Sequence, residues 1–100
     1  MDNNIQLAKV IQLSKPYHFE GKEYTDIDLS KIDDITGEQL MNIEKKFEMT
    51  GNFSALKEMN LTYAVFVASE ITGLPLEFFK GLPGKDATKI RTVVAGAFLN

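Results

Sequence analysis

The chain has 100 residues, of which 44% are apolar and 25% charged, as in ordinary globular proteins, so disorder is not expected. It contains no cysteine, which excludes disulfides and thiolate metal sites, and no apolar run near the ~20 residues that span a bilayer. The net charge of −3 argues against nucleic acid as a general partner, and the polar N-terminus MDNNIQ against a signal peptide, so we expect a cytoplasmic protein without membrane contact.

The first thirty residues predict β structure. Alternating apolar residues favour an extended strand with one apolar side: Ile5, Leu7, Ile11 and Leu13. We expect Ser14-Lys15-Pro16 to end this strand, because proline cannot donate to a β-ladder. Aromatic and β-branched runs then flank Glu20-Gly21, which is typical of a β-hairpin with a tight turn.

A first helix is predicted to begin after Thr36. Thr36 and Gln39 have the spacing of a capping box, in which each side chain accepts from the backbone of the other residue. An apolar stripe follows, and Gly51 is placed to end the helix. Met41 and Met49 fall outside that stripe, where methionines are either tolerated or form adaptable contact surfaces. We expect residues 52–59 to form a linker or an extra helical turn.

The segment 60–82 concentrates the apolar side chains of the chain, and its first part predicts a central helix. Asn60 is a suitable N-cap, and Gly73 a suitable left-handed stop. One face of this helix is apolar: Ala64, Val67, Ala68 and Ile71. Phe66 falls among polar residues instead, a position that helix packing within one domain does not require. Most such helices are structural scaffolds, but Phe66 indicates a partner.

Two further helices complete the predicted fold. A short helix is expected over residues 75–80, ending at Gly81, and Asp86 is expected to cap the last helix. That helix has a compact apolar arc: Ala87, Ile90, Val93, Val94, Ala97 and Phe98. The fold class is therefore α+β, an N-terminal strand and hairpin followed by a small bundle of three to four helices. We expect one domain over residues 1–100, with a β part at 1–30 and a helical part at 31–100.

The sequence offers poor material for catalysis or cofactor binding. His18 is the only histidine and lies between aromatic residues of a predicted strand, which favours a packing or surface role. The segment from Asp26 resembles the start of a calcium loop, but Lys31 and Gly37 stand where glycine and glutamate are needed. We therefore predict a protein that is not an enzyme and has no catalytic, cofactor or metal site.

Charge is distributed unevenly along the chain. Residues 20–48 contain nine acidic side chains against four lysines, whereas residues 80–91 contain four basic side chains against Asp86 alone. Two solvated faces explain such asymmetry in most proteins. It also favours head-to-tail contact between copies, so self-association is expected as a property of the chain.

Three stretches of the chain resemble the tail assembly chaperones of long-tailed bacteriophages, grouped with the tail proteins of Mu-like and P2-like phages. They are the hairpin SKPYHFEGKEYT with IDL behind it, the helix start DITGEQL, and the turn ITGLP followed by Leu82-Pro83 and Asp86. The resemblance implies a non-enzymatic helper in the cytoplasm of the infected cell. Such a protein binds the tape measure protein and keeps its helices soluble while the tail tube polymerises around it. The alternative is a structural or tail-completion protein that stays in the phage particle.

The resemblance supplies no fixed contact positions, so the contact residues are a hypothesis drawn from the pattern of apolar side chains. Five of these occupy positions that packing within their own helices does not clearly require: Phe66, Met41, Met49, Phe78 and Phe79. We expect them to form an apolar groove that receives an amphipathic helix of the tape measure protein.

Overall fold

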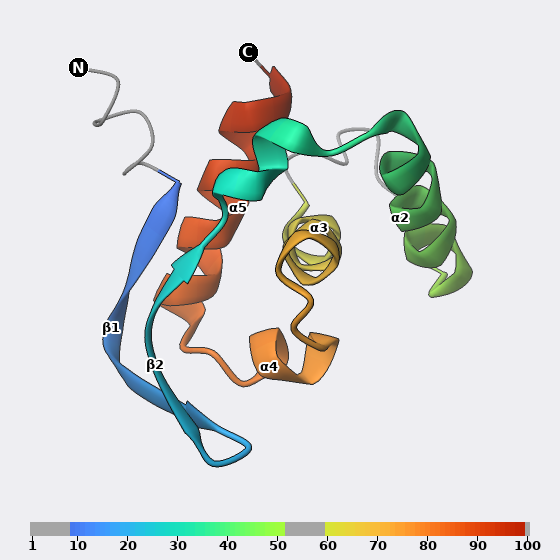
Figure 1. The fold of residues 1–100 in the computed structure, drawn as a ribbon. Helices are drawn as coiled ribbons and strands as arrows, with labels where there is room; N and C mark the ends of the chain where they lie inside the picture. Colours follow the sequence, from blue (N-terminus) through green and yellow to red (C-terminus); the bar gives the residue numbers. More distant parts are fainter. Residues whose placement is uncertain (1–8, 52–59, 100) are drawn as a thin grey trace, which may run out of the picture.

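A computed structural model describes residues 9–51 and 60–99, and these form an antiparallel hairpin followed by four α-helices (Figure 1). The predicted α+β class is therefore confirmed. The helix α3 (Leu61–Thr72) lies at the centre and is seen nearly end-on in Figure 1. It packs against α5 (Gly84–Leu99) on one side and α2 (Gly37–Met49) on the other, and the hairpin packs against α5.

The hairpin consists of β1 (Val10–Phe19) and β2 (Lys22–Asp28), joined by the predicted turn. Glu20 and Gly21 both have positive φ, 50° and 79°, as the central residues of a type I′ turn require. Glycine adopts this conformation at no steric cost, and the turn matches the twist of the flanking strands. This explains why a two-residue connection suffices here.

The expected end of the first strand at residues 14–16 is wrong, because β1 continues through Pro16 to Phe19. Gln12 pairs with Asp26 and Tyr17 with Tyr24, so residues 13–16 of β1 lie opposite a single residue of β2. This bulge removes Pro16 from the ladder, where its missing N–H would leave an acceptor unpaired. The residues Ile5 and Leu7, expected in the same strand, lie outside the described residues.

After a short 3₁₀ helix, η1 (Ser30–Asp34), the helix α2 begins with the predicted capping box. The Thr36 hydroxyl accepts from the Gln39 N–H at 3.2 Å, and the Gln39 side-chain oxygen accepts from the Thr36 N–H at 3.0 Å. Ile43 and Phe47 are buried on the inner face of the helix. Residues 52–59, for which a linker or helical turn was expected, lie outside the described residues.

The central helix α3 has the predicted ends and the predicted inner face. The Asn60 side chain accepts from the Tyr63 N–H at 3.0 Å, and Gly73 adopts φ 79° at the C-terminus. Its buried residues are Tyr63, Ala64, Val67, Ala68 and Ile71. This face packs against α5, and two of its five buried residues are alanines, Ala64 and Ala68.

The short helix α4 (Leu76–Lys80) places two phenyl rings in the core of the molecule. The Phe78 ring makes edge-to-face contacts with rings of both hairpin strands, at centroid distances of 5.1 Å to Tyr17, 5.3 Å to Phe19 and 4.8 Å to Tyr24. The Tyr17 hydroxyl also donates to the Phe78 carbonyl at 2.8 Å. These contacts attach the hairpin to α4.

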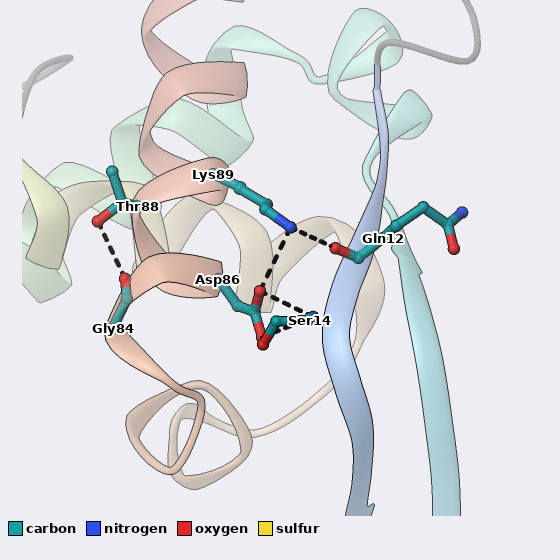
Figure 2. A network of polar contacts seen from close by, with 6 residues as sticks. All are labelled: Gln12, Ser14, Gly84, Asp86, Thr88 and Lys89. Carbon is teal, nitrogen blue, oxygen red and sulfur yellow. Dashed lines mark hydrogen bonds and ion pairs between the residues drawn. The ribbon is translucent and has the colours of Figure 1, made fainter.

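The expectation that Asp86 caps the last helix is wrong. The helix α5 begins at Gly84, and the Asp86 N–H already donates to the Pro83 carbonyl within the first turn. The Asp86 carboxylate instead points across to β1, where it is fully buried (Figure 2). Asp86 lies three residues beyond the N-cap position, Pro83, and its side chain makes a tertiary contact instead of a cap.

A network of polar contacts joins α5 to β1 around this carboxylate (Figure 2). The Ser14 N–H donates to the two Asp86 oxygens at 3.1 and 3.2 Å, and the Ser14 hydroxyl donates at 3.0 Å. Lys89 lies 3.5 Å from the carboxylate and donates to the Gln12 carbonyl at 2.7 Å. Burial raises the pKa of Asp86, but the Ser14 hydrogen bonds and Lys89 outweigh burial and hold that pKa below its ordinary value.

Candidate protein-binding grooves

A groove with a volume of about 660 Å³ lies between α2, the C-terminal half of α3 and the turn into α4. Its apolar wall is formed by large side chains from all three segments: Ile43, Met49, Phe66, Leu74, Pro75 and Leu76. Polar groups from Lys46, Thr50, Ser69 and Glu70 complete the lining. A mainly apolar groove with a few polar groups in its lining is suited to an amphipathic helix or to a long apolar side chain.

Phe66 lies in the wall of this groove and is half-buried. The Phe47 ring of α2 meets it edge-to-face, with centroids 6.2 Å apart, and this contact contributes to holding α2 against α3. The position outside the buried face of α3 is therefore explained by the adjoining helix, because α2 covers part of the ring. The remaining surface of the ring is accessible from the groove.

The two methionines proposed as contact residues differ in their surroundings. Met49 is 80% exposed at the end of α2 and lines the groove. Met41, at 72%, is almost as exposed but contributes to none of the described grooves. The structure thus brings Met49 and Phe66 together and leaves Met41 apart from them.

A salt bridge crosses the groove between α2 and α3. The Lys46 ammonium lies 3.7 Å from the Glu70 carboxylate, with the two side chains 67% and 26% exposed. Because both groups remain in contact with water, the pair contributes little to stability. Its main consequence is that the two charges of this groove neutralise each other.

A second groove, with a volume of about 310 Å³, lies on the other side of Phe66 between α3, α4 and the start of α5. Large apolar side chains again dominate the lining: Leu61, Val65, Phe66, Leu76, Phe79 and Leu82. Lys80 contributes the ammonium of this groove. Since Phe66 and Leu76 belong to both linings, the two grooves are neighbours on the surface of α3.

The expectation that packing leaves Phe78 and Phe79 free is wrong. Their side chains are 0% and 2% exposed, in the core cluster formed by the hairpin, α3 and α5. Phe79 reaches the floor of the second groove, whereas Phe78 contributes to none of the described grooves. The sequence gives a short helix with two adjacent aromatic residues, and a helix of one turn has no periodicity from which to assign an inner face.

Residues 9–51 and 60–99 contain few side chains of the kinds used in catalysis or metal binding. Within these ranges no three His, Cys, Asp or Glu side chains are grouped so as to hold a metal ion. His18 is exposed on the hairpin, with its Nε2 3.2 Å from a Glu23 oxygen. No helix of the described residues is long and apolar enough to cross a membrane.

A comparison with protein families identifies the family of the chain. The model of the family described as phage tail assembly chaperone proteins, E, or 41 or 14, matches residues 10–99. The chain belongs to this family. The match runs from β1 to the end of α5 and so includes both grooves. No curated protein and no solved structure matches the chain.

Membership of the phage tail assembly chaperones confirms the resemblance stated from the hairpin, the helix start and the turn at residues 71–75. It gives the protein a role in tail assembly with a protein partner in the tail. The family also favours a non-enzymatic role. For a chaperone of this kind, the apolar grooves are the candidate surfaces for binding a protein partner.

Several groove residues were not identified from the sequence. Leu61, Leu74 and Leu76 flank or end their helices, where periodicity assigns no face, and Lys80 reads as an ordinary helix-terminal lysine. The grooves arise because α2 and α4 pack on neighbouring parts of α3 without meeting along it. Single-helix patterns contain no information on such a tertiary arrangement.

Proposed function

We propose that this chaperone binds an amphipathic helix of the tape measure protein in the groove lined by Met49 and Phe66. Binding takes place in the host cytoplasm during assembly and keeps the apolar face of that helix out of water until the tail tube encloses it. The observation that carries the proposal is an open apolar groove of about 660 Å³ in a member of a tail assembly chaperone family.

Physical chemistry supports this occupant. A large apolar side chain that moves from water into the groove contributes about 1.5–3 kcal/mol. Met49 has three rotatable bonds and a polarizable sulfur, so it adapts to differently shaped partners at small cost. A tape measure protein is long and offers repeated helical segments, for which an adaptable groove is better suited than a tightly specific one.

The test is co-expression with the tape measure protein, affinity capture and light scattering of the captured complex. We expect capture by the natural chain and loss of capture by Met49→Glu, which places a carboxylate in the groove. Met41→Glu is the matched control, because it makes the same change on the same helix at a similarly exposed position outside the groove. Circular dichroism checks that both variants stay folded.

Two results would contradict the proposal. Failure of the natural chain to capture the tape measure protein, together with its presence in purified phage particles, would favour the structural role instead. Equal loss of capture with Met41→Glu and Met49→Glu would place the binding surface elsewhere on α2. Light scattering of the free protein also measures self-association, which the charge asymmetry of the chain supports.

A further inference from the structure

We propose that the bound helix of the partner spans both grooves, with one large apolar side chain in each, a small residue over Phe66 and a carboxylate beside Lys80. This deepens, and presupposes, the tape measure binding proposed above. It assigns the second groove to the binding surface and gives a residue pattern for the partner segment.

The spacing of the two grooves sets the pattern of the partner. Along α3 the first groove is lined by Phe66, Ser69, Glu70 and Gly73, and the second by Leu61, Thr62, Val65 and Phe66. The centres of these two sets differ by about six residues, or about 9 Å along the helix axis. A partner helix that lies along α3 places side chains about seven residues apart at nearly this distance, since seven residues rise by about 10.5 Å.

Phe66 lies between the two grooves and determines the size of the partner side chain that can pass from one groove to the other. Its half-buried ring lines both grooves and packs edge-to-face on the Phe47 ring. We therefore expect it to form a ridge between the two grooves. The residue of the partner midway between the two large side chains passes over this ridge. A small side chain there, alanine or glycine, allows both large ones to reach their grooves.

The charges of the two grooves differ, and this orients the partner. In the first groove Lys46 and Glu70 neutralise each other. In the second, Lys80 is exposed, and no carboxylate of the described residues forms a salt bridge with it. A partner carboxylate beside the second groove attracts the Lys80 ammonium, and a basic residue there is repelled.

The described surface of a second copy fits the two grooves poorly. Three large apolar side chains of the described residues are exposed: Met41, Met49 and Leu61. Two of them already line the grooves, Met49 in the first and Leu61 in the second. On the described surface of a second copy, Met41 is the exposed large apolar side chain that lies outside the grooves. One such side chain cannot fill two grooves.

Site-specific photo-cross-linking to the co-expressed tape measure protein tests this placement. A photoreactive phenylalanine analogue replaces Met49, Leu61 or, as the control, Met41, and the cross-linked peptides are mapped. We expect Met49 and Leu61 to label one segment of the tape measure protein at positions about seven residues apart, with no specific label from Met41. The segment should carry a small residue between the two positions and an acidic residue near the one labelled from Leu61.

The outcomes separate this inference from the proposed function. Capture of the tape measure protein with labelling from Met49 but none from Leu61 would overturn the two-groove placement and leave the first groove as the site. Labelling of a second copy from both positions would overturn it in favour of self-association. A natural chain that captures no tape measure protein would refute the proposed function itself.

Charge reversal at the second groove gives an independent readout. We expect Lys80→Glu to weaken capture about threefold to tenfold at low salt, with the difference shrinking as salt is raised. Lys45→Glu makes the same change on exposed α2 surface outside both linings and should leave capture unchanged. Equal effects of the two variants would show that only net charge matters, and would remove Lys80 from the site.

Discussion

Replacement of Asp86 by alanine tests whether the polar network between α5 and β1 stabilises the fold. The change removes the acceptor of the Ser14 N–H and of the Ser14 hydroxyl, which lie 3.0–3.2 Å from the carboxylate, and the counter-charge of Lys89. It also leaves a cavity in a position that is 0% exposed. The network and the packing are therefore lost together.

The magnitude follows from the hydrogen bonds. Each bond to a charged acceptor contributes about 1.5–3 kcal/mol, and the desolvation of the carboxylate offsets part of the total. We expect a net loss of about 2–4 kcal/mol in the free energy of unfolding for Asp86→Ala. In a domain of this size about 1 kcal/mol lowers Tm by ~4–8 °C, so a fall of at least about 8 °C is expected. Urea and thermal unfolding followed by circular dichroism measure both quantities.

The pH dependence provides a sharper check through Asp86→Asn, which keeps the shape but loses the charge. The pKa of Asp86 is lower in the folded chain than its ordinary value, so the folded state binds its proton less readily than the unfolded state. The stabilisation is complete above the unfolded pKa, near 3.9, and is lost as the pH falls through the folded pKa. The stability difference between natural chain and variant should thus be largest at neutral pH and shrink in acid.

Two results would refute this reasoning. A difference between the natural chain and Asp86→Asn that is the same at pH 7 and pH 2 would show that the charge of Asp86 is not what stabilises the network. Unfolding of Asp86→Ala at the same urea concentration as the natural chain would show that the network contributes no net stability. Ser14→Ala, which removes one of the hydrogen bonds and no charge, should lie between the natural chain and Asp86→Ala.

Substitutions at Phe78, Gly81 and Gly73, with controls at Met41 and Tyr17, test the placement of core and turn residues by thermal unfolding. Phe78→Ala should lower the free energy of unfolding by about 3–5 kcal/mol because the ring is fully buried, whereas Met41→Ala should change it by no more than about 0.5 kcal/mol. Similar effects of the two substitutions would contradict the burial of Phe78 and the exposure of Met41. Gly81→Ala should destabilise because the added Cβ overlaps the Tyr17 hydroxyl, and combining it with Tyr17→Phe should recover much of the loss. Gly73→Ala should cost about 1 kcal/mol or more because its φ of 79° strains other residues, and an unchanged Tm would contradict that conformation.

The start of α2 and both ends of α3 were predictable because local chemistry fixes them. Thr36 with Gln39, Asn60 and Gly73 act within a few residues of themselves, and each behaves in the structure as its local sequence indicates. The buried face of α3 was predictable for the same reason, since twelve residues give enough turns for a periodicity. Short-range signals of this kind need no knowledge of the tertiary structure.

The errors share a tertiary cause. Pro16 was expected to end the strand, but a bulge on β1 lets the ladder resume beyond it. Asp86 has the chemistry of a helix cap, yet it accepts from a strand 72 residues earlier in the chain. Phe78 lies in a helix too short for periodicity, and only the hairpin rings around it show that it is core.

The candidate site was predictable in part. Phe66 was singled out correctly as a residue outside the buried face of its helix, and Met49 as an exposed methionine. Their shared groove depends on how α2 lies across α3, which no local pattern encodes. The second groove, with Leu61 and Lys80, was not anticipated, because its residues come from three helices that are separated along the chain.

The buried carboxylate of α5 also affects how the hairpin meets other chains. An exposed strand edge with free backbone groups is a template for pairing with another chain, and proteins commonly block it. Here the Ser14 N–H is bonded by Asp86 and the Gln12 carbonyl by Lys89, so these two backbone groups of β1 are not available to an incoming strand. An incoming strand that pairs with this part of β1 must therefore first displace both side chains of α5.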